Sequence, residues 1–419
     1  MFFERSAKSL DEHHEARLVG AASAGNALFL RTVLDELRQH GDHFTIGEVI
    51  DRYLAANTLD ELLALVLERY ERDFERDRPG LVRDAMRALW AARRGLTEPE
   101  LLDCLGGVAD GGAPVPHAVW SPLVLAAEAG LVTHSGRLVF STEPHRRAVE
   151  RRYLKTDDDR RAAHAALART FAAYELGPRV VDELPWQQLG AGNVGGLVAT
   201  LSDLAFMDRA YRQGQAELRQ LWAKAEQAGY RVVDAYRSIV DDPAGNPDMA
   251  WEVARMVTDA GYPVQAAGLH RHLVDSYRQR VDETAHRRLP SALVNLGAAL
   301  MGQGELIAAE APLREAIALS RGRNDRAALQ GALGNLALCL RDLGHLDDAA
   351  ALFAEEEATC RGGGDTSRLQ ANLGNRAQLL RQRGDHRGAL ALMNEQEKLC
   401  RSIGDLAGVA ARSPARAPF

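Results

Sequence analysis

Three asparagines and two arginines recur at fixed spacing in the last third of the chain. Asn295, Asn335 and Asn375 are 40 residues apart, and Arg341 and Arg381 each follow an asparagine by six residues. An amide side chain donates and accepts hydrogen bonds at once, so a row of asparagines can pair with an extended peptide backbone. Six residues are about 1.7 turns of a helix, and we expect each arginine to lie on the same side of the array as its asparagine. The pattern predicts a peptide-binding surface that favours acidic ligands.

The segments that carry these residues are copies of one another. They read ALVNLGAALMGQGEL at 292–306, ALGNLALCLRDLGHL at 332–346 and NLGNRAQLLRQRGDH at 372–386. Glycines and aspartates recur at the same offset, at Gly304, Gly344, Gly384, Asp325, Asp365 and Asp405. A period of 40 with two helices in each unit predicts an α-solenoid. A degenerate earlier unit is expected at 249–288, where Gly261 and Ala266 align with the later glycines and alanines.

The units resemble tetratricopeptide repeats. In the middle unit, the positions that this family uses for packing hold Leu333, Leu336, Ala337, Leu340, Gly344, Ala349 and Phe353. Small residues at Gly297, Ala337 and Ala377 would let paired helices approach closely, whereas Arg376 stands where a core apolar residue is usual. In that family the asparagine position faces a concave groove, so the resemblance implies that the three asparagines line one.

An alternative role for the asparagines is structural, because they could bond between adjacent repeats and only space them. The family's carboxylate-clamp pattern is not met, since its cation positions hold Val294, Gly334 and Gly374. The repeat that begins after Asp405 soon reaches AARSPARAPF, whose prolines exclude a helix. We expect the array to stop mid-repeat before a disordered tail at 410–419. Its exposed end would indicate truncation or an intermolecular partner, such as a separate ATPase core or a second copy of the chain.

Other residue clusters predict no metal, cofactor or catalytic site. Three histidine pairs lack cysteine or carboxylate companions at ligand spacing: His13 and His14, His40 and His43, His270 and His272. The four cysteines have no CxxC spacing, so they predict reduced thiols rather than a zinc site or a disulfide frame. No Ser/His/Asp constellation is visible, although such triads are not local in sequence.

Composition narrows the setting further. The 419 residues suffice for two to four domains of roughly 100–200 residues each. A net charge of −7 argues against a protein that binds nucleic acid by charge alone. We find no secretion signal and no stretch of about 18 apolar residues that could span a bilayer. We therefore expect a cytoplasmic protein with no nucleic-acid or membrane partner.

The first half of the chain predicts a different architecture. Helical periodicity appears at 28–41, directly after Asn26, and again over 46–76. The block 79–155 combines helices, one of them capped by Thr97, with the hairpin LVTHSGRLVF, which is the winged-helix arrangement. The fold class is mainly α, in this order: helical lid 1–78, winged helix 79–155, helical linker 156–248, and repeat array 249–409 with units 249–288, 289–325, 326–365 and 366–405.

The order of these segments resembles bacterial STAND-class signal-transduction ATPases with NACHT- or nephrocystin-like modules. The resemblance rests on GNALFLRTVLDELRQHG, AARRGLTEPELLDCLG, VWSPLVLAAEAGLV, RRAVERRYL and ELPWQQL, followed by the repeats. It implies that an ATPase core comes first in the family order. A lid, a winged helix, a linker and a repeat sensor follow it. In such proteins the winged helix would hold the nucleotide domain closed until a ligand of the repeats releases it for oligomerisation.

Two positions depart from the family pattern. The family has a proline against the adenine ring where this chain has Ala27, and a histidine that reaches the phosphates where it has Thr142. His145 follows three residues later. Asn26 and Ala27 therefore form either a simple helix cap or a vestigial nucleotide lid. No GxxxxGK[ST] phosphate loop occurs, so we predict that the chain alone neither binds nor hydrolyses ATP.

Three functions follow from these expectations. The first is a non-catalytic interaction scaffold, the sensor portion of a STAND-type protein without its phosphate-loop core, that binds a protein or peptide in the repeat groove. The second is an ATPase subunit completed in trans by a separate core. The third is a winged-helix transcriptional regulator, which the apolar helix HAVWSPLVLAAEAGL disfavours because we expect its surface to be buried.

Overall fold

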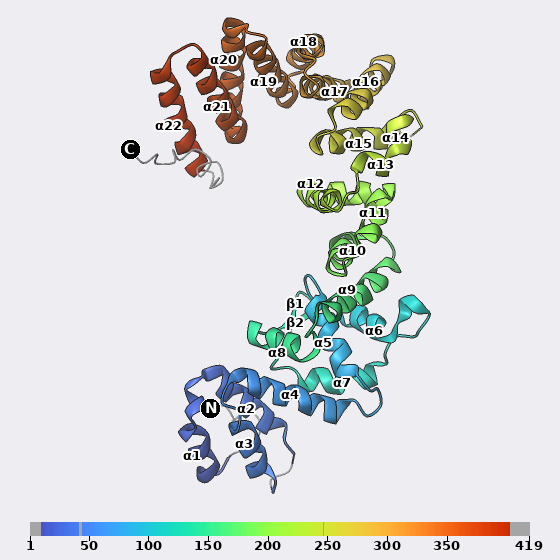
Figure 1. Cartoon of the computed structure of the whole chain (residues 1–419), viewed down its shortest axis with the longest axis vertical. Helices are drawn as coiled ribbons and strands as arrows, with labels where there is room; N and C mark the ends of the chain where they lie inside the picture. Colours follow the sequence, from blue (N-terminus) through green and yellow to red (C-terminus); the bar gives the residue numbers. More distant parts are fainter. Residues whose placement is uncertain (1–9, 42–43, 246, 403–419) are drawn as a thin grey trace. The chain divides into compact units, whose positions relative to one another are not determined.

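The computed structural model describes residues 10–41, 44–245 and 247–402 (Figure 1). It divides into two compact units, one up to Gln213 and one from Gly214. The described residues form helices and one two-stranded hairpin, which confirms a mainly α fold. Helix α12 (Leu204–Gln227) crosses the division, and Gly214 interrupts its helical backbone with φ −175° and ψ 93°. The division therefore falls inside the segment expected to be a linker.

The first unit is ordered as follows: α1 (Glu12–Gly20), the 3-10 helix η1 (Ala22–Gly25), α2 (Ala27–Gln39), α3 (Ile46–Leu54), α4 (Leu59–Phe74), α5 (Leu81–Ala91), α6 (Glu98–Gly106), the 3-10 helix η2 (Val108–Asp110), α7 (His117–Ala126), β1 (Leu131–His134), β2 (Arg137–Phe140), α8 (Glu143–Tyr153), α9 (Asp157–Ala172), α10 (Pro178–Gly190) and α11 (Val194–Ser202). The helical periodicity over 46–76 is divided between α3 and α4. Thr58 begins a new helix there by accepting a hydrogen bond from the Glu61 amide, 3.2 Å away.

The hairpin is attached to the helices that precede it. Strands β1 and β2 are antiparallel, with Leu131 opposite Phe140, and the turn residues Ser135 and Gly136 both have positive φ (50° and 77°). Such turns match the twist of paired strands. Leu96, between α5 and α6, forms a further antiparallel bridge with Leu138. The hairpin expected in the block 79–155 is present, and its bridge to Leu96 was not expected.

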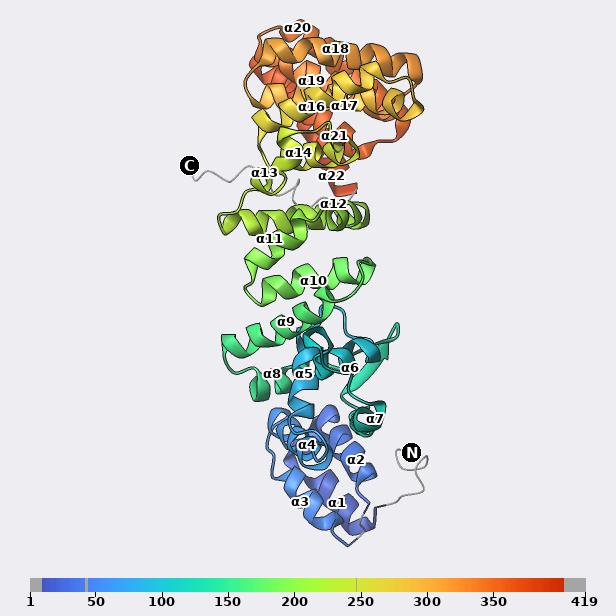
Figure 2. The same ribbon diagram turned by 90° about the vertical axis from the view of Figure 1, so that its right-hand side faces the viewer.

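The second unit continues in antiparallel helix pairs (Figures 1 and 2). Its helices after α12 are α13 (Val232–Ala235), α14 (Arg237–Asp241), α15 (Pro247–Asp259), α16 (Pro263–Gln279), α17 (Glu283–Gly302), α18 (Leu306–Arg323), α19 (Arg326–Asp342), α20 (Leu346–Gly363), α21 (Thr366–Gln382) and α22 (His386–Ser402). The repeats therefore consist of α17–α18, α19–α20 and α21–α22. Helix α17 begins at Glu283, six residues before the expected repeat boundary at 289.

Recurrent residues explain why the helices begin and end where they do. The first helices of the three pairs are capped by the side chains of Asp282, Asp325 and Asp365. Glycines with φ of 80°, 88° and 82° lie in the turn inside each pair, at Gly304, Gly344 and Gly384. Within the first pair, a Cβ at Gly297 would lie 2.5 Å from Leu313 Cγ, so a small residue is required there. Asp405 and 410–419 lie outside the described residues.

Candidate peptide-binding groove

The first helix of each pair contributes to one continuous face of the array. Helix α17 contacts α19, and α19 contacts α21, in addition to the contacts within each pair. In a curved stack of repeats, the helices that approach one another across repeats lie on the inner side. The asparagines and arginines selected from the sequence all lie on α17, α19 or α21. We call the face formed by these three helices the repeat groove.

The three asparagines are half-buried in the repeat groove and keep their hydrogen-bonding capacity free. Asn295, Asn335 and Asn375 are each partly exposed. In the described part of the chain, none of their side-chain amides hydrogen-bonds to another protein group. If the asparagines served only as spacers between repeats, their side chains would form such bonds, and they do not. Each amide can therefore donate to and accept from a bound backbone.

The two arginines differ in their surroundings. Arg341 pairs with Asp342 at 2.8 Å and donates to Gln378 Oε1 at 3.1 Å, which links α19 to α21. The side chain of Arg381 is exposed and forms no ion pair or hydrogen bond with the other described residues. Arg376, at an expected core position, pairs with Glu357 of α20. Of these three arginines, only Arg381 is thus fully available as a cation for an acidic ligand.

A buried polar cluster performs the spacing role and was not predicted. Asn372 is fully buried on α21 and donates to Phe353 O at 2.9 Å and Glu356 Oε2 at 2.7 Å on α20. Burial raises the pKa of Glu356. The carboxylate occupies the space beside Gly334, where a Cβ would lie 2.7 Å from Glu356 Oε1. The glycine that breaks the clamp pattern therefore accommodates a buried glutamate.

The second helices of the pairs are joined by ion pairs that recur with the repeat. Arg321 pairs with Glu355 at 2.6 Å and Arg361 pairs with Glu395 at 2.5 Å. An equivalent pair joins Arg278 of α16 to Glu315 of α18. We call this row the outer ladder. The outer ladder could have been predicted from the sequence, because arginine recurs at 321, 361 and 401 and glutamate at 315, 355 and 395.

The structure separates the four residues considered as a vestigial nucleotide lid. Asn26 accepts from the amides of Leu28 and Phe29 and is the N-cap of α2, and Ala27 is exposed. Thr142 Oγ1 lies 2.7 Å from His145 Nδ1 at the start of α8. Within the described residues, no hydrogen bond or ion pair joins the first two residues to the last two. The helix-cap role of Asn26 is therefore observed directly.

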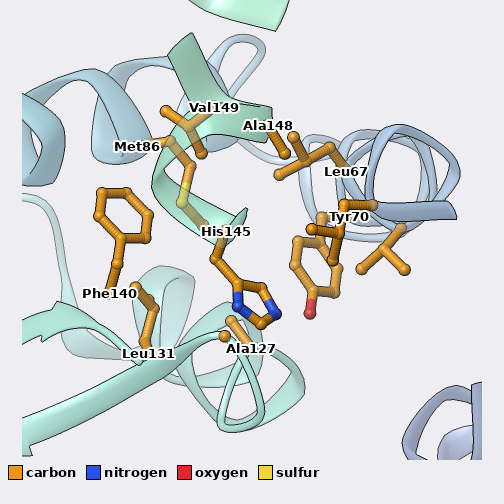
Figure 3. Close-up of a pocket in the computed structure, with 12 residues that line it drawn as sticks. Leu67, Tyr70, Met86, Ala127, Leu131, Phe140, His145, Ala148 and Val149 are labelled. Atoms are coloured by element: carbon orange, nitrogen blue, oxygen red, sulfur yellow. The ribbon is translucent and has the colours of Figure 1, made fainter. Parts of the chain in front are cut away.

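His145 points into a small apolar cavity between α4, α5, the segment that follows α7, the hairpin and α8 (Figure 3). The cavity has a volume of about 30 Å³, which corresponds to roughly one water molecule. Tyr70, Met86 and Phe140 are among its walls. Burial lowers the pKa of His145, so the ring is neutral near pH 7. This geometry suits a histidine that packs between helices.

The described residues add three further observations. No group of three or more His, Cys, Asp or Glu side chains among them is arranged to hold a metal ion, and His43 lies outside them. None of the described helices has both the length and the apolar character to cross a bilayer. The expectation that α7 is buried is wrong in part. Trp120 and Leu123 are buried, but 68% of Leu125 is exposed.

Comparisons with known proteins identify the repeats. No protein-family model matches the chain. A tetratricopeptide-repeat-containing protein of Dictyostelium discoideum is 30% identical over 212 residues, which are 50% of this chain but only 12% of that protein. Together with the helix pairs, this likeness shows that the chain contains helical repeats of the tetratricopeptide type.

Two solved structures are similar to a lower degree. A STAND protein with a tetratricopeptide-repeat sensor from Pyrococcus horikoshii is 13% identical, with a TM-score of 0.39, over 97% of this chain and 54% of that one. Aspartyl phosphate phosphatase F from Bacillus subtilis is 12% identical, also with a TM-score of 0.39, over 64% of this chain and 72% of that one. TM-scores at this level do not establish a common fold.

Proposed function

We propose that the chain is a non-catalytic interaction scaffold whose repeat groove binds an extended protein or peptide segment. The observation that carries this proposal is the row of three half-buried asparagines without protein partners, on helices that contact one another along the array. Half-buried amides gain most from a ligand that satisfies both their donors and their acceptor. Arg381 adds an unpaired cation near the last asparagine, which favours carboxylates in the ligand.

We further propose that this scaffold is the regulatory and sensor portion of a STAND-type protein. The order of a helical segment, a block of helices with a hairpin, a linker and repeats supports this role, as does the sequence pattern around Asn26. In this role, occupation of the repeat groove would alter how the first unit engages an ATPase core. A core supplied in trans is the second candidate, and the absence of a phosphate-loop motif from this sequence favours it over intrinsic ATPase activity.

The test measures peptide binding by groove variants of the full chain. Peptides selected by phage display on the wild-type chain are labelled and titrated by fluorescence anisotropy. The double variant Asn335→Ala/Asn375→Ala should weaken binding about tenfold or more, because two backbone-pairing amides are lost. Asn394→Ala is the matched control, because Asn394 is exposed on α22, outside the groove. Unchanged affinity in the double variant would refute the groove assignment, and ATP turnover by the isolated chain would refute the non-catalytic role.

A further inference from the structure

A second hollow lies in the first unit, beside the hairpin. It has a volume of about 680 Å³ and lies between the end of α5, strand β2 and the start of α8. Its walls include Arg94, His134, Arg137, Phe140, Thr142 and Arg146. We call it the hairpin groove. It has the size of a site for a ligand or a short peptide segment.

The lining of the hairpin groove is strongly cationic. Four arginines but only one carboxylate, that of Glu143, line it. Asp182 forms ion pairs with two of these arginines, at 3.0 Å from Arg93 and 3.4 Å from Arg94. The other two arginines remain to be explained.

Arg137 and Arg146 have no carboxylate partner among the described residues, and both are half-buried. The guanidinium of Arg146 stacks on the ring of Trp90, with 5.0 Å from Cζ to the ring centroid. Stacking fixes the plane of the guanidinium and leaves most of its N–H groups free. Partly desolvated cations without counter-charges favour an anionic ligand.

The edge of β2 supplies hydrogen-bonding groups of a different kind. Leu138 uses its N–H and C=O to pair with Leu96, at 2.7 and 3.2 Å. In an antiparallel pair, alternate residues point their backbone groups to the same side, so those of Phe140 also point away from β1. No described backbone group outside the hairpin bonds to them. The groove therefore offers one free backbone donor and one free acceptor.

The opposite wall is held rigidly. The buried carboxylate of Glu183 accepts hydrogen bonds from the amides of Arg93 and Arg94, each at 3.2 Å. Gly95 approaches β2 so closely that a Cβ would lie 2.5 Å from Leu138 O. A preorganised wall lowers the entropic cost of binding.

We propose that the hairpin groove binds an extended acidic segment of a partner protein. Carboxylates of the segment pair with Arg137 and Arg146, and its backbone pairs with Phe140 at the edge of β2. A peptide backbone matches both the donor and the acceptor of Phe140, whereas a phosphate chain supplies acceptors only. Nucleic acid is further disfavoured by the net charge of −7 and by the neighbouring helix α7, which carries no Lys or Arg.

The experiment uses the full chain and a fluorescein-labelled nine-residue peptide in which Glu alternates with Val. The control peptide has Gln in place of Glu, and binding is followed by fluorescence anisotropy at low salt. We expect the acidic peptide to bind at least tenfold more tightly than its Gln analogue. Arg137→Gln/Arg146→Gln should abolish this preference, and Arg137→Gln alone should reduce it. The single variant tests the proposal even if loss of the stack on Trp90 perturbs the fold.

Matched variants locate the binding. Arg147→Gln is the control, because Arg147 is exposed on the same helix but does not line the hairpin groove. The affinity of this variant for the acidic peptide should change less than twofold. The affinity of Asn335→Ala/Asn375→Ala should also change less than twofold, because these substitutions test the repeat groove and not the hairpin groove. Methylation of the peptide amides should weaken binding through loss of pairing with Phe140. Equal binding of the two peptides, an unchanged Arg137→Gln variant, or more effective competition by single-stranded DNA or inorganic phosphate would overturn the proposal.

Discussion

The two units of the chain differ in where their pairs of arginine and carboxylate side chains lie. In the repeat array, arginine–glutamate pairs recur along the outer ladder, and their side chains are largely exposed. In the first unit, arginines meet carboxylates that are buried and far away in sequence. Glu36, for example, accepts from Arg69 and from Tyr53 in the core of the helical segment. Solvent screening makes the former pairs weak, whereas buried networks are costly to break.

The difference teaches that periodic charges and buried charges have different roles. The array relies on apolar contacts between helices, so each ladder pair adds little. The first unit depends on single carboxylates that each satisfy several donors. Glu183, for example, accepts from the amides of Arg93 and Arg94, from Arg179 at 2.8 Å and from Gln187 at 2.8 Å. Substitutions that separate these roles provide direct tests.

The largest effect is expected at Glu183. Replacement by alanine leaves its buried donors without an acceptor and should lower the free energy of unfolding of the first unit by about 3–5 kcal/mol. Urea denaturation followed by circular dichroism measures this change. Glu175→Ala, at an exposed position on the loop before α10, should cost less than about 0.5 kcal/mol. If Glu183→Ala lowers the free energy of unfolding by less than about 1 kcal/mol, the proposed difference between the two units is wrong.

A buried histidine is expected to make the array sensitive to acid. His270 is fully buried, and burial lowers its pKa from 6.5 to about 4. The unfolded chain therefore takes up a proton at higher pH than the folded one, and stability falls as the pH drops from 6.5 towards 4. The loss attributable to this residue should reach about 3 kcal/mol. In His270→Gln the slope of unfolding free energy against pH should be smaller over this range; an identical slope would contradict the prediction.

An intermediate effect is expected where Gly334 meets Glu356. Gly334→Val should cost about 1–3 kcal/mol, because the new side chain overlaps the buried carboxylate. Adding Glu356→Ala together with Asn372→Ala should recover most of the loss, since this combination copies Val294, Ala316 and Ala332 of the preceding repeat and leaves no buried amide unpaired. Thermal denaturation of Gly334→Val, of Glu356→Ala/Asn372→Ala and of their combination measures the coupling. If the two losses simply add, the steric explanation fails.

The smallest effect is expected in the outer ladder. A double-mutant cycle with Arg321→Gln and Glu355→Gln should give a coupling energy below about 1 kcal/mol. The coupling should disappear in about 1 M salt, where exposed charges are screened. Urea denaturation at two salt concentrations measures both quantities. A coupling above about 2 kcal/mol that persists in salt would make the array resemble the first unit.

Periodicity determined how much of the fold could be predicted. The helix pairs, the recurrence of Asp325 and Asp365, and the small residue at Gly297 follow from the 40-residue offset, because each repeat confirms the others. The hairpin and the Thr97 cap follow from local turn and capping chemistry. The start of α17 could not be placed from the offset, because its capping residue Asp282 precedes Asp325 by 43 residues rather than 40.

The site could be predicted only in part. The recurrence of the asparagines placed them on one face, but sequence spacing does not reveal whether Arg341 is already engaged by Gln378. The hairpin groove escaped prediction altogether. Its arginines come from three separate segments, and their lack of carboxylate partners depends on the tertiary fold. Neither property leaves a periodic signal.

The close fit between the two helices of each pair has an evolutionary consequence. Val294 lies at the repeat position of Gly334 and Gly374, and the facing positions hold Ala316, Glu356 and Gln396. A larger residue on one side is matched by a smaller one on the other, so neither position can drift alone. Among descendants of this sequence, the two positions should be substituted together, and each repeat should show its own matched pair of a larger and a smaller residue.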